Sequence, residues 1–157
     1  MIHLALYQPE IPPNTGNLIR LCANSGARLH LIHPLGFRTD DASLRRAGLD
    51  YAEFVDIRHH ADWAGFRAAL PGSRLLAFTT RGTQRYDRVA YREDDVLLFG
   101  PESRGLPQSL LEELPHEQRV YLPMRPDNRS LNLSNAASIA VFEAWRQLGF
   151  CGARTDG

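Results

Sequence analysis

The amino-acid sequence predicts an α/β fold in which a mostly parallel, Rossmann-like sheet is sandwiched between helices. Strand-like and helix-like segments alternate along the chain, a pattern typical of βα units. The segments Leu75–Phe78 and Val96–Phe99 are apolar at every position, as parallel strands are when helices cover both faces of a sheet. The 157 residues suit one domain. We therefore expect a single domain over residues 1–157, with a flexible tail from about residue 150.

The individual elements follow from the spacing of apolar residues and from the residues that stop helices. Gly26 and the pair Pro71-Gly72 each follow an apolar-periodic segment and end it. The predicted strands are Ile2–Tyr7, Arg28–His33, Glu53–Ile57, Arg74–Thr79, Asp95–Gly100 and Arg119–Leu122. The predicted helices are Asn14–Ser25, Asp41–Ala47, Ala61–Leu70, Pro107–Leu114 and Ser134–Leu148. The polar stretch Arg81–Asp94 is expected to be a surface loop.

Charge and cysteine content exclude several classes of protein. All 18 basic residues are arginines and balance 18 acidic residues, which excludes a Schiff-base lysine, a P-loop lysine and an amine general base. The net charge of zero argues against indiscriminate coating of nucleic acid, but it allows a local arginine patch. Two cysteines cannot form a disulfide framework. Without a signal peptide or a membrane-spanning apolar run, the sequence predicts a reduced, cytoplasmic protein with no membrane partner.

Several common active-site signatures are absent from the sequence. There is no dinucleotide fingerprint after the first strand, and Gly100–Gly105 lacks the Lys-Ser/Thr of a phosphate-binding loop. No G-x-S-x-G marks a hydrolase nucleophile. The six histidines show no metal-ligand spacing, and adjacent His59 and His60 are expected to form a solvated loop pair. The sequence therefore predicts no metal site.

The first unusual segment is Pro9–Arg20, where a strand ends in a proline-rich turn and a helix begins. Asn14, Asn17 and Arg20 are three residues apart, so they lie roughly on one face of that helix. The N-terminal end of a helix offers free N–H groups and a partial positive charge, which suit a phosphate. The spacing alone is explained equally well by an asparagine cap and a surface arginine.

Two further segments place polar side chains after predicted strands. Leu97–Pro107 runs from a buried strand into Gly100 and Glu102, at the carboxyl end of a strand, where α/β folds bind ligands. A glycine there lets the backbone approach a ligand closely. Leu122–Asn135 is rich in hydroxyl and amide side chains. These side chains could cap the following helix and satisfy turns, but the repeated pattern in Ser130–Asn135 exceeds what a cap requires.

Together and in this order, the three segments resemble the three motifs of the SPOUT methyltransferases. The branch concerned carries N-x-G-N-x-x-R, F-G-P-E-x-x-G-[LI]-P and S-[LM]-N-L-S-N-A, and the resemblance runs essentially end to end. It is greatest to those members that methylate the ribose of the tRNA wobble nucleotide. The resemblance implies a trefoil knot in the C-terminal half, a homodimer, and S-adenosyl-L-methionine as the methyl donor without a metal. General rules of chain topology argue against a knot, so only the resemblance predicts it.

The resemblance also assigns roles to residues. The expected reaction moves the sulfonium methyl to the ribose 2′-hydroxyl of nucleotide 34, a C or a modified U, in the tRNA anticodon stem-loop. Arg20 is expected to orient the hydroxyl and the adjoining phosphate, because a guanidinium is a poor base. The other residues expected in catalysis are Asn14, Asn17, Glu102, Ser134 and Asn135. The residues expected to bind the cofactor are Phe78, Thr79, Gly100, Glu102, Gly105, Leu122, Met124, Ser130, Leu131 and Asn132.

Two alternatives to the hypothesis of wobble-nucleotide methylation stay open. One is 2′-O-methylation at another tRNA position or in ribosomal RNA, and the other is a non-catalytic RNA-binding module on the same fold. Leu131 and Phe142 stand where the family pattern favours methionine and tyrosine. The change at position 131 keeps apolar volume, whereas the change at position 142 removes a hydroxyl.

The last predicted helix carries an expectation about assembly. Residues 134–148 are apolar around most of the helix circumference, more than one sheet face can cover. A two-fold partner would supply the second cover, with an interface centred on Val141, Phe142 and Trp145; the chain's own first helix is the alternative cover. The resemblance places Arg20 across that interface.

Overall fold

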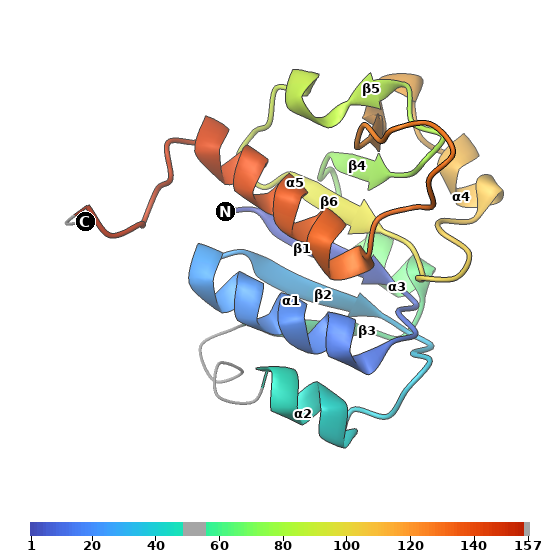
Figure 1. Ribbon diagram of the computed structural model, residues 1–157, viewed down its shortest axis with the longest axis vertical. Helices are drawn as coiled ribbons and strands as arrows, with labels where there is room; N and C mark the ends of the chain where they lie inside the picture. The colour runs from blue at the N-terminus through green and yellow to red at the C-terminus, as the bar shows by residue number, and fades with distance from the viewer. Residues whose placement is uncertain (49–55, 156–157) are drawn as a thin grey trace.

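The computed structural model describes residues 1–48 and 56–155, and these form a sheet with helices on both faces (Figure 1). The strands are β1 (His3–Tyr7), β2 (Arg28–Ile32), β3 (Ile57–His60), β4 (Leu75–Phe78), β5 (Gln84–Arg85), β6 (Val96–Phe99) and β7 (Arg119–Tyr121). The helices are α1 (Pro12–Ser25), α2 (Ala42–Gly48), α3 (Trp63–Ala69), α4 (Gln108–Glu112) and α5 (Leu133–Gln147), with 3-10 turns η2 (Tyr86–Arg88) and η3 (His116–Gln118). The predicted α/β class is confirmed.

All seven described strands belong to one sheet, in the order β3-β2-β1-β6-β4-β7-β5. Each neighbouring pair is parallel, so the carboxyl ends of the strands lie along one edge, toward which the arrows point in Figure 1. The chain order reverses between β1 and β6, and such a reversal opens a crevice at the carboxyl ends of the strands. The trefoil knot that the resemblance implies stays a prediction.

The structure differs from the predicted elements in two places. Within the expected surface loop Arg81–Asp94, Gln84–Arg85 pairs with β7 as the short edge strand β5. Two polar residues carry no apolar alternation, so no sequence pattern indicates this strand. Residues 53–55 of the predicted third strand lie outside the described residues, and the described strand β3 is Ile57–His60.

The expected loop pair His59-His60 is wrong, because both residues belong to β3. His60 Nε2 lies 2.9 Å from His30 Nδ1, and His30 Nε2 lies 2.9 Å from His3 Nδ1. The three rings therefore form a row across three neighbouring strands, which we call the histidine row. The neighbouring side chain in β3, His59, extends to the opposite face of the sheet, and its Nδ1 pairs with His33 Nε2 at 2.9 Å. Cross-strand partners override the local preference for a polar loop.

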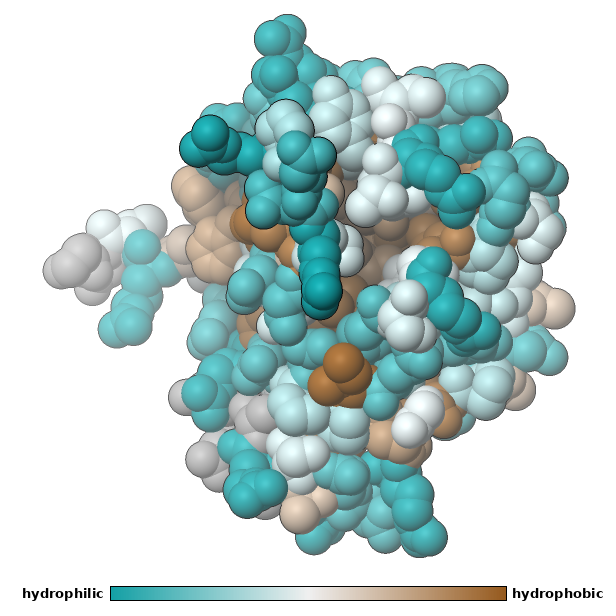
Figure 2. Space-filling model, turned by 45° about the vertical axis from the view of Figure 1, so that its right-hand side comes forward, coloured by the Kyte–Doolittle hydropathy of each residue, from teal (hydrophilic) through white to brown (hydrophobic). Residues whose placement is uncertain are grey.

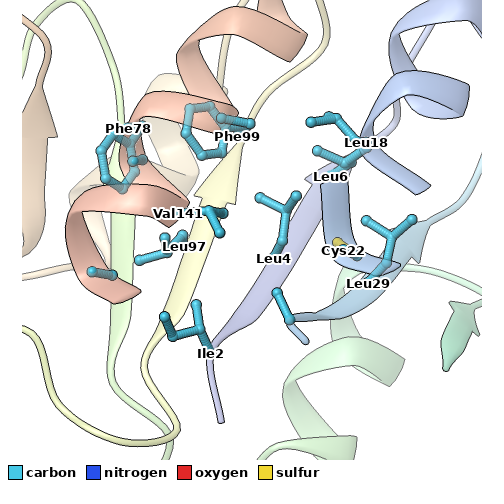
Figure 3. Close-up of a cluster of buried hydrophobic side chains, with 14 of the residues drawn as sticks. Ile2, Leu4, Leu6, Leu18, Cys22, Leu29, Phe78, Leu97, Phe99 and Val141 are labelled. Atoms are coloured by element: carbon cyan, nitrogen blue, oxygen red, sulfur yellow. The ribbon is translucent and has the colours of Figure 1, made fainter. Parts of the chain in front are cut away.

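Two apolar clusters fill the space between the sheet and its helices. The larger cluster joins one sheet face to α1, α2 and α5, and Figure 3 shows its side chains meeting between these layers. The smaller cluster joins the other face to α3 and α4 through Phe66, Leu110 and Leu111. Val141 belongs to the larger cluster and is 0% exposed. The expectation that Val141 lies in a dimer interface is therefore wrong, because the chain's own sheet already covers it.

The two long helices lie side by side on one face of the sheet (Figure 1). α1 thus covers part of α5, as the sequence left open. Ile139 and Phe142 nevertheless keep 40% and 45% of their surface exposed. The indole Nε1 of Trp145 donates to the carbonyl oxygen of Cys151, and its ring packs edge-on against Phe150. The outward face of α5 therefore carries large apolar side chains that the described residues leave partly uncovered.

Candidate functional site

A cavity of about 470 Å³ opens at the carboxyl ends of β4, β6 and β7. Its volume is within the usual range for small-molecule pockets. Figure 2 turns this side of the molecule forward and shows a hollow with apolar surface at its base and polar surface around it. The stacked rings of Phe78 and Phe99, with centroids 4.7 Å apart and planes 12° apart, line the cavity from the ends of β4 and β6.

The cavity brings together residues from three distant segments of the chain. All the residues that the sequence analysis assigned to the cofactor line it: Phe78, Thr79, Gly100, Glu102, Gly105, Leu122, Met124, Ser130, Leu131 and Asn132. Of the residues expected in catalysis, Asn14 and Glu102 line it. Arg20, Asn17, Ser134 and Asn135 are not among the lining residues. The cavity thus collects the expected binding set, while part of the expected catalytic set lies outside it.

The loop after β6 depends on two glycines for different reasons. Gly105 has φ +69°, a left-handed conformation that glycine adopts without steric cost. A Cβ on Gly100 would lie 2.3 Å from Leu106 N and 2.4 Å from Gly105 C. The close approach at Gly100 is therefore to the chain's own backbone. The prediction that this glycine makes room for a ligand needs that correction, because the loop itself already requires it.

The residues just before α1 are bonded to a side chain from another loop. Pro12 and Pro13 have no N–H, and Asn14 N donates to Ile11 O. The Glu102 carboxylate accepts from Glu10 N at 2.9 Å and from Ile11 N at 2.6 Å. The N–H groups just before α1 and that of Asn14 therefore already have acceptors within the chain, so of the two explanations that the spacing left open the structure disfavours a phosphate seat. A carboxylate satisfies the same preference for negative charge at a helix start.

The start of α5 is capped from within its own segment. Asn132 Oδ1 accepts from Ser134 N, from Asn135 N and from Ser134 Oγ, which is the usual bonding of an N-cap. Asn132 Nδ2 donates to Asn14 Oδ1 at 3.1 Å, and Asn14 Nδ2 donates to Glu102 Oε2 at 3.3 Å. Ser134 and Asn135 serve the cap, while Asn132, Asn14 and Glu102 form one polar row that joins all three segments.

Comparison with known proteins identifies the family. Residues 1–142 match the SpoU rRNA Methylase family.

The chain belongs to that family.

It is 58% identical to a tRNA (cytidine(34)-2'-O)-methyltransferase of Escherichia coli strain K12, with 98% of each chain covered. It is 62% identical to a protein of the same name from Burkholderia cenocepacia strain HI2424, with 97% of this chain and 99% of that one covered. A solved structure described as giving insight into 2-OH methylation of C/U34 on tRNA superposes with a TM-score of 0.90. That chain is 51% identical, and the match covers 95% of this chain and 97% of that chain.

A solved structure of lower sequence identity differs in length. The AdoMet-bound rRNA methyltransferase of Sinorhizobium meliloti superposes with a TM-score of 0.82 at 28% identity. The match covers 94% of this chain but only 56% of that one. The chain described here therefore corresponds to about half of that longer methyltransferase.

In this SpoU methylase, Arg20 and Asn17 lie on α1 and are exposed. Asn14, on the same helix, is only 5% exposed because it reaches into the polar row. The expected common face is therefore divided. Asn14 lies in the cavity wall, whereas Asn17 and Arg20 of the same helix are exposed to solvent.

The sequence analysis missed several lining residues of this SpoU methylase. Ser103 and Arg104 belong to the loop after β6, and Thr80 and Arg81 follow β4 directly. Their position just beyond predicted strands was the signal that could have found them. Arg81 and Arg104 are exposed as well as lining the cavity. They give its mouth positive charge that suits phosphate groups.

Proposed function

We propose that this SpoU methylase uses S-adenosyl-L-methionine to methylate the ribose 2′-hydroxyl of nucleotide 34, a C or a modified U, in the anticodon stem-loop of tRNA. The observation that carries the proposal is the convergence of the three motif segments on one cavity at the carboxyl edge of the sheet. Relatives with the tRNA (cytidine(34)-2'-O)-methyltransferase name support the substrate, since they match over nearly the full chain. Such a reaction takes place in the cytoplasm.

The cavity has the shape and chemistry that the cofactor needs. Phe78 and Phe99 stack on each other and are nearly buried, and they contribute apolar lining to the cavity against which the adenine ring would pack. Polar side chains at Ser130 and Asn132 also line the cavity, together with Leu131 and Met124. When bound, S-adenosyl-L-methionine supplies an already activated methyl group on a sulfonium centre. The protein's own task is then to align the acceptor oxygen and to exclude water.

Arg20 orients the ribose hydroxyl and the adjoining phosphate in this mechanism. Its guanidinium presents fixed donors that match phosphate oxygens. Arg20 does not line the cavity of its own chain, so the proposal needs the helix of a partner to bring it there. The exposed Arg81 and Arg104 at the cavity mouth hold the RNA backbone of the same stem-loop.

The partner in this proposal is a second copy of the chain. The outward face of α5 carries Ile139 and Phe142, which are 40% and 45% exposed, and α1 with Asn17 and Arg20 lies beside it. Large apolar side chains gathered on one face indicate an interaction surface. A two-fold axis through this face would cover the apolar side chains and bring each Arg20 toward the partner's cavity.

Methylation of ribosomal RNA or of another tRNA position is the second candidate. It has some support in the family description and in the Sinorhizobium meliloti neighbour. The lengths disfavour it, because the chain covers 56% of that rRNA enzyme but 98% of the curated tRNA relative from Escherichia coli. The non-catalytic alternative lacks a specific supporting observation.

The decisive experiment follows a labelled methyl group from S-adenosyl-L-methionine into RNA. The substrates are two matched tRNAs, one natural and one with a 2′-deoxyribose at nucleotide 34 only. We expect label in the natural tRNA and background in the deoxy form, since the acceptor oxygen is missing. Equal labelling of both tRNAs would move the reaction to another nucleotide of the tRNA, and no labelling of either tRNA would contradict the proposed function.

The homodimer is tested by a charge on the exposed face of α5. Phe142→Glu is expected to give monomers and to abolish methylation, because the carboxylate would be buried at the interface. Ala68→Glu, which adds the same charge at an exposed position of α3 on the other face of the sheet, is the control. Sedimentation velocity checks both variants, and an active wild-type monomer would contradict the shared site.

A further inference from the structure

Two carboxylates tie the loop after β1 to the loop after β6, and they do so in opposite directions. Glu102, from the loop after β6, accepts from Glu10 N and Ile11 N at the start of α1. Glu10, from the loop after β1, accepts from Ser103 N at 2.9 Å and from Ser103 Oγ at 2.7 Å. The loop after β1 is thus bonded by Glu102, and the loop after β6 is bonded by Glu10. We call this reciprocal arrangement the carboxylate clasp.

The backbone places Glu10 for this contact. Gly36 N donates to Pro9 O at 2.9 Å, and a Cβ on Gly36 would lie 2.8 Å from Glu10 Cα. The loop after β2 therefore packs directly on Glu10 and leaves its backbone little room to move. The hydrogen bonds from Ser103 lower the pKa of the Glu10 carboxyl below its ordinary value, with a smaller contribution from the charge of Arg104. Glu10 is thus ionised at neutral pH and remains an acceptor.

Glu10 acts from behind the cavity wall, since Ser103, Glu102 and Arg104 line the cavity and Glu10 does not. Both of the bonds that Glu10 accepts come from Ser103, next to Glu102, which bonds the backbone just before α1. Loss of the Glu10 acceptor would free the Ser103 end of the loop while leaving the Glu102 bonds in place. The loop could then shift relative to the start of α1.

We propose that Glu10 is a positioning residue for methyl transfer: through Ser103 it fixes the spacing between the cavity wall at Pro101–Gly105 and α1, the helix that carries Arg20. The inference rests on the proposed function, because it assumes that α1 brings Arg20 to the acceptor ribose. Transfer reactions need the reacting atoms within a few tenths of an ångström of their best arrangement, and a shift of about 1 Å costs on the order of 100-fold in rate.

The test compares Glu10→Ala with Glu10→Gln, using Glu117→Ala as a control at an exposed residue of η3. Glu10→Ala is expected to lower kcat for tRNA methylation by roughly 10-fold to 100-fold while KM for tRNA changes by less than about threefold. Glu10→Gln should recover most of the loss, because its side-chain oxygen replaces the single oxygen that accepts both bonds. Glu117→Ala should match the wild type.

A double-mutant cycle identifies the route of the effect. Ser103→Ala removes the hydroxyl donor and keeps the amide, so it should lower kcat less than Glu10→Ala does. The double variant should be no slower than Glu10→Ala alone, because the two side chains act through one contact. Additive losses in the cycle, a normal kcat for Glu10→Ala, or a Glu10→Gln as slow as Glu10→Ala would each overturn the proposal.

A measurement without RNA separates this inference from the proposed function. Amide exchange of residues 102–105 should be faster in Glu10→Ala than in the wild type and the Glu10→Gln variant, since the Ser103 amide loses its acceptor. Unchanged exchange would overturn the clasp even in an active enzyme. A wild type that methylates no tRNA, with the exchange difference present, would instead overturn the proposed function alone.

Discussion

The molecule contains two polar rows that each join three chain segments, and they differ in what they face. The histidine row, His60–His30–His3, crosses three strands inside the sheet, beneath the ring of Phe66, which packs edge-on against His30 and His60. The row Asn132–Asn14–Glu102 crosses three loops at the carboxyl edge and lines the cavity.

The difference between the rows shows how a site can be told from a structural network. Both give hydrogen-bond partners to a buried polar side chain, His30 in one row and Asn14 in the other, as folding requires in any case. Only the row at the carboxyl edge keeps its members on the wall of a cavity that a ligand can enter. Substitutions in the histidine row should therefore change stability, and substitutions around the cavity should change turnover.

The largest effect is expected from His30→Ala. His30 is 2% exposed and bonds both neighbours in the row, so its loss leaves a void and two unsatisfied rings. We expect a destabilisation of about 3 kcal/mol, with kcat at low temperature within about twofold of the wild type. Urea unfolding and a methylation assay measure the two quantities. A stable but inactive variant would break the distinction between the rows.

Arg20→Ala should show the opposite pattern. Because Arg20 is exposed on α1, its removal should hardly change the unfolding midpoint. Turnover should fall on the order of 100-fold or more, with binding of S-adenosylhomocysteine retained. Arg92→Ala, exposed at the amino-terminal side of β6, is the control. Near-normal turnover in Arg20→Ala would remove this arginine from the mechanism.

Acid should lower the contribution of the histidine row to the free energy of unfolding. Burial lowers the pKa of His30 to about 3, and the charges of the neighbouring histidines and of Arg28 and Arg58 act in the same direction. The unfolded chain binds this proton near pH 6.5, so the stabilisation is complete above that pH and is lost as the pH falls from 6.5 toward 3. Between pH 7 and pH 5 we expect a loss of about 2 kcal/mol from His30.

The control for the acid effect is His30→Phe, which cannot titrate at this position. Its unfolding free energy should fall less than that of the wild type over the same pH range. Parallel pH profiles for the two proteins would contradict the assignment of the acid effect to His30. The pKa values of His3 and His60 are also lowered, chiefly by burial, so a residual slope in the variant is expected.

The smallest effect is expected from Gly105→Ala. No heavy atom lies within 4 Å of a Cβ built there, and φ is +69°, so the cost is the left-handed backbone alone, about 1 kcal/mol. Calorimetric unfolding checks the stability. Cofactor affinity should remain within about threefold, because no side chain blocks the cavity. A large loss of affinity would mean that the loop changes shape when it loses this glycine.

Much of the fold and of the candidate site was predictable because it is encoded locally. Continuous apolar runs such as Leu75–Phe78 mark buried parallel strands, and polar residues directly beyond such strands mark the carboxyl edge. This local pattern indicated the edge of the sheet, whereas the resemblance to the SPOUT methyltransferases grouped Phe78, Gly100 and Asn132, which line one cavity in the structure.

The features that the sequence did not reveal depend on partners far along the chain. His60 lies in a strand where its ring pairs with that of His30, 30 residues away. Glu102 accepts a hydrogen bond from Ile11 N, 91 residues earlier and just before α1. Val141 was expected at an interface because the apolar pattern of its helix does not reveal which residues the sheet covers, and the sheet buries Val141. Each of these outcomes is set by tertiary contacts that periodicity does not contain.

The two-residue strand β5 also determines how the sheet ends. An outer strand normally exposes a row of unpaired N–H and C=O groups, on which another chain can form an intermolecular sheet. β5 offers only Gln84–Arg85 before the chain turns into η2. At the opposite edge, β3 carries the charged Arg58, which is paired with Asp56. One border is thus only two residues long and the other carries a charged side chain, and both features disfavour edge-to-edge pairing of sheets from two copies of the chain.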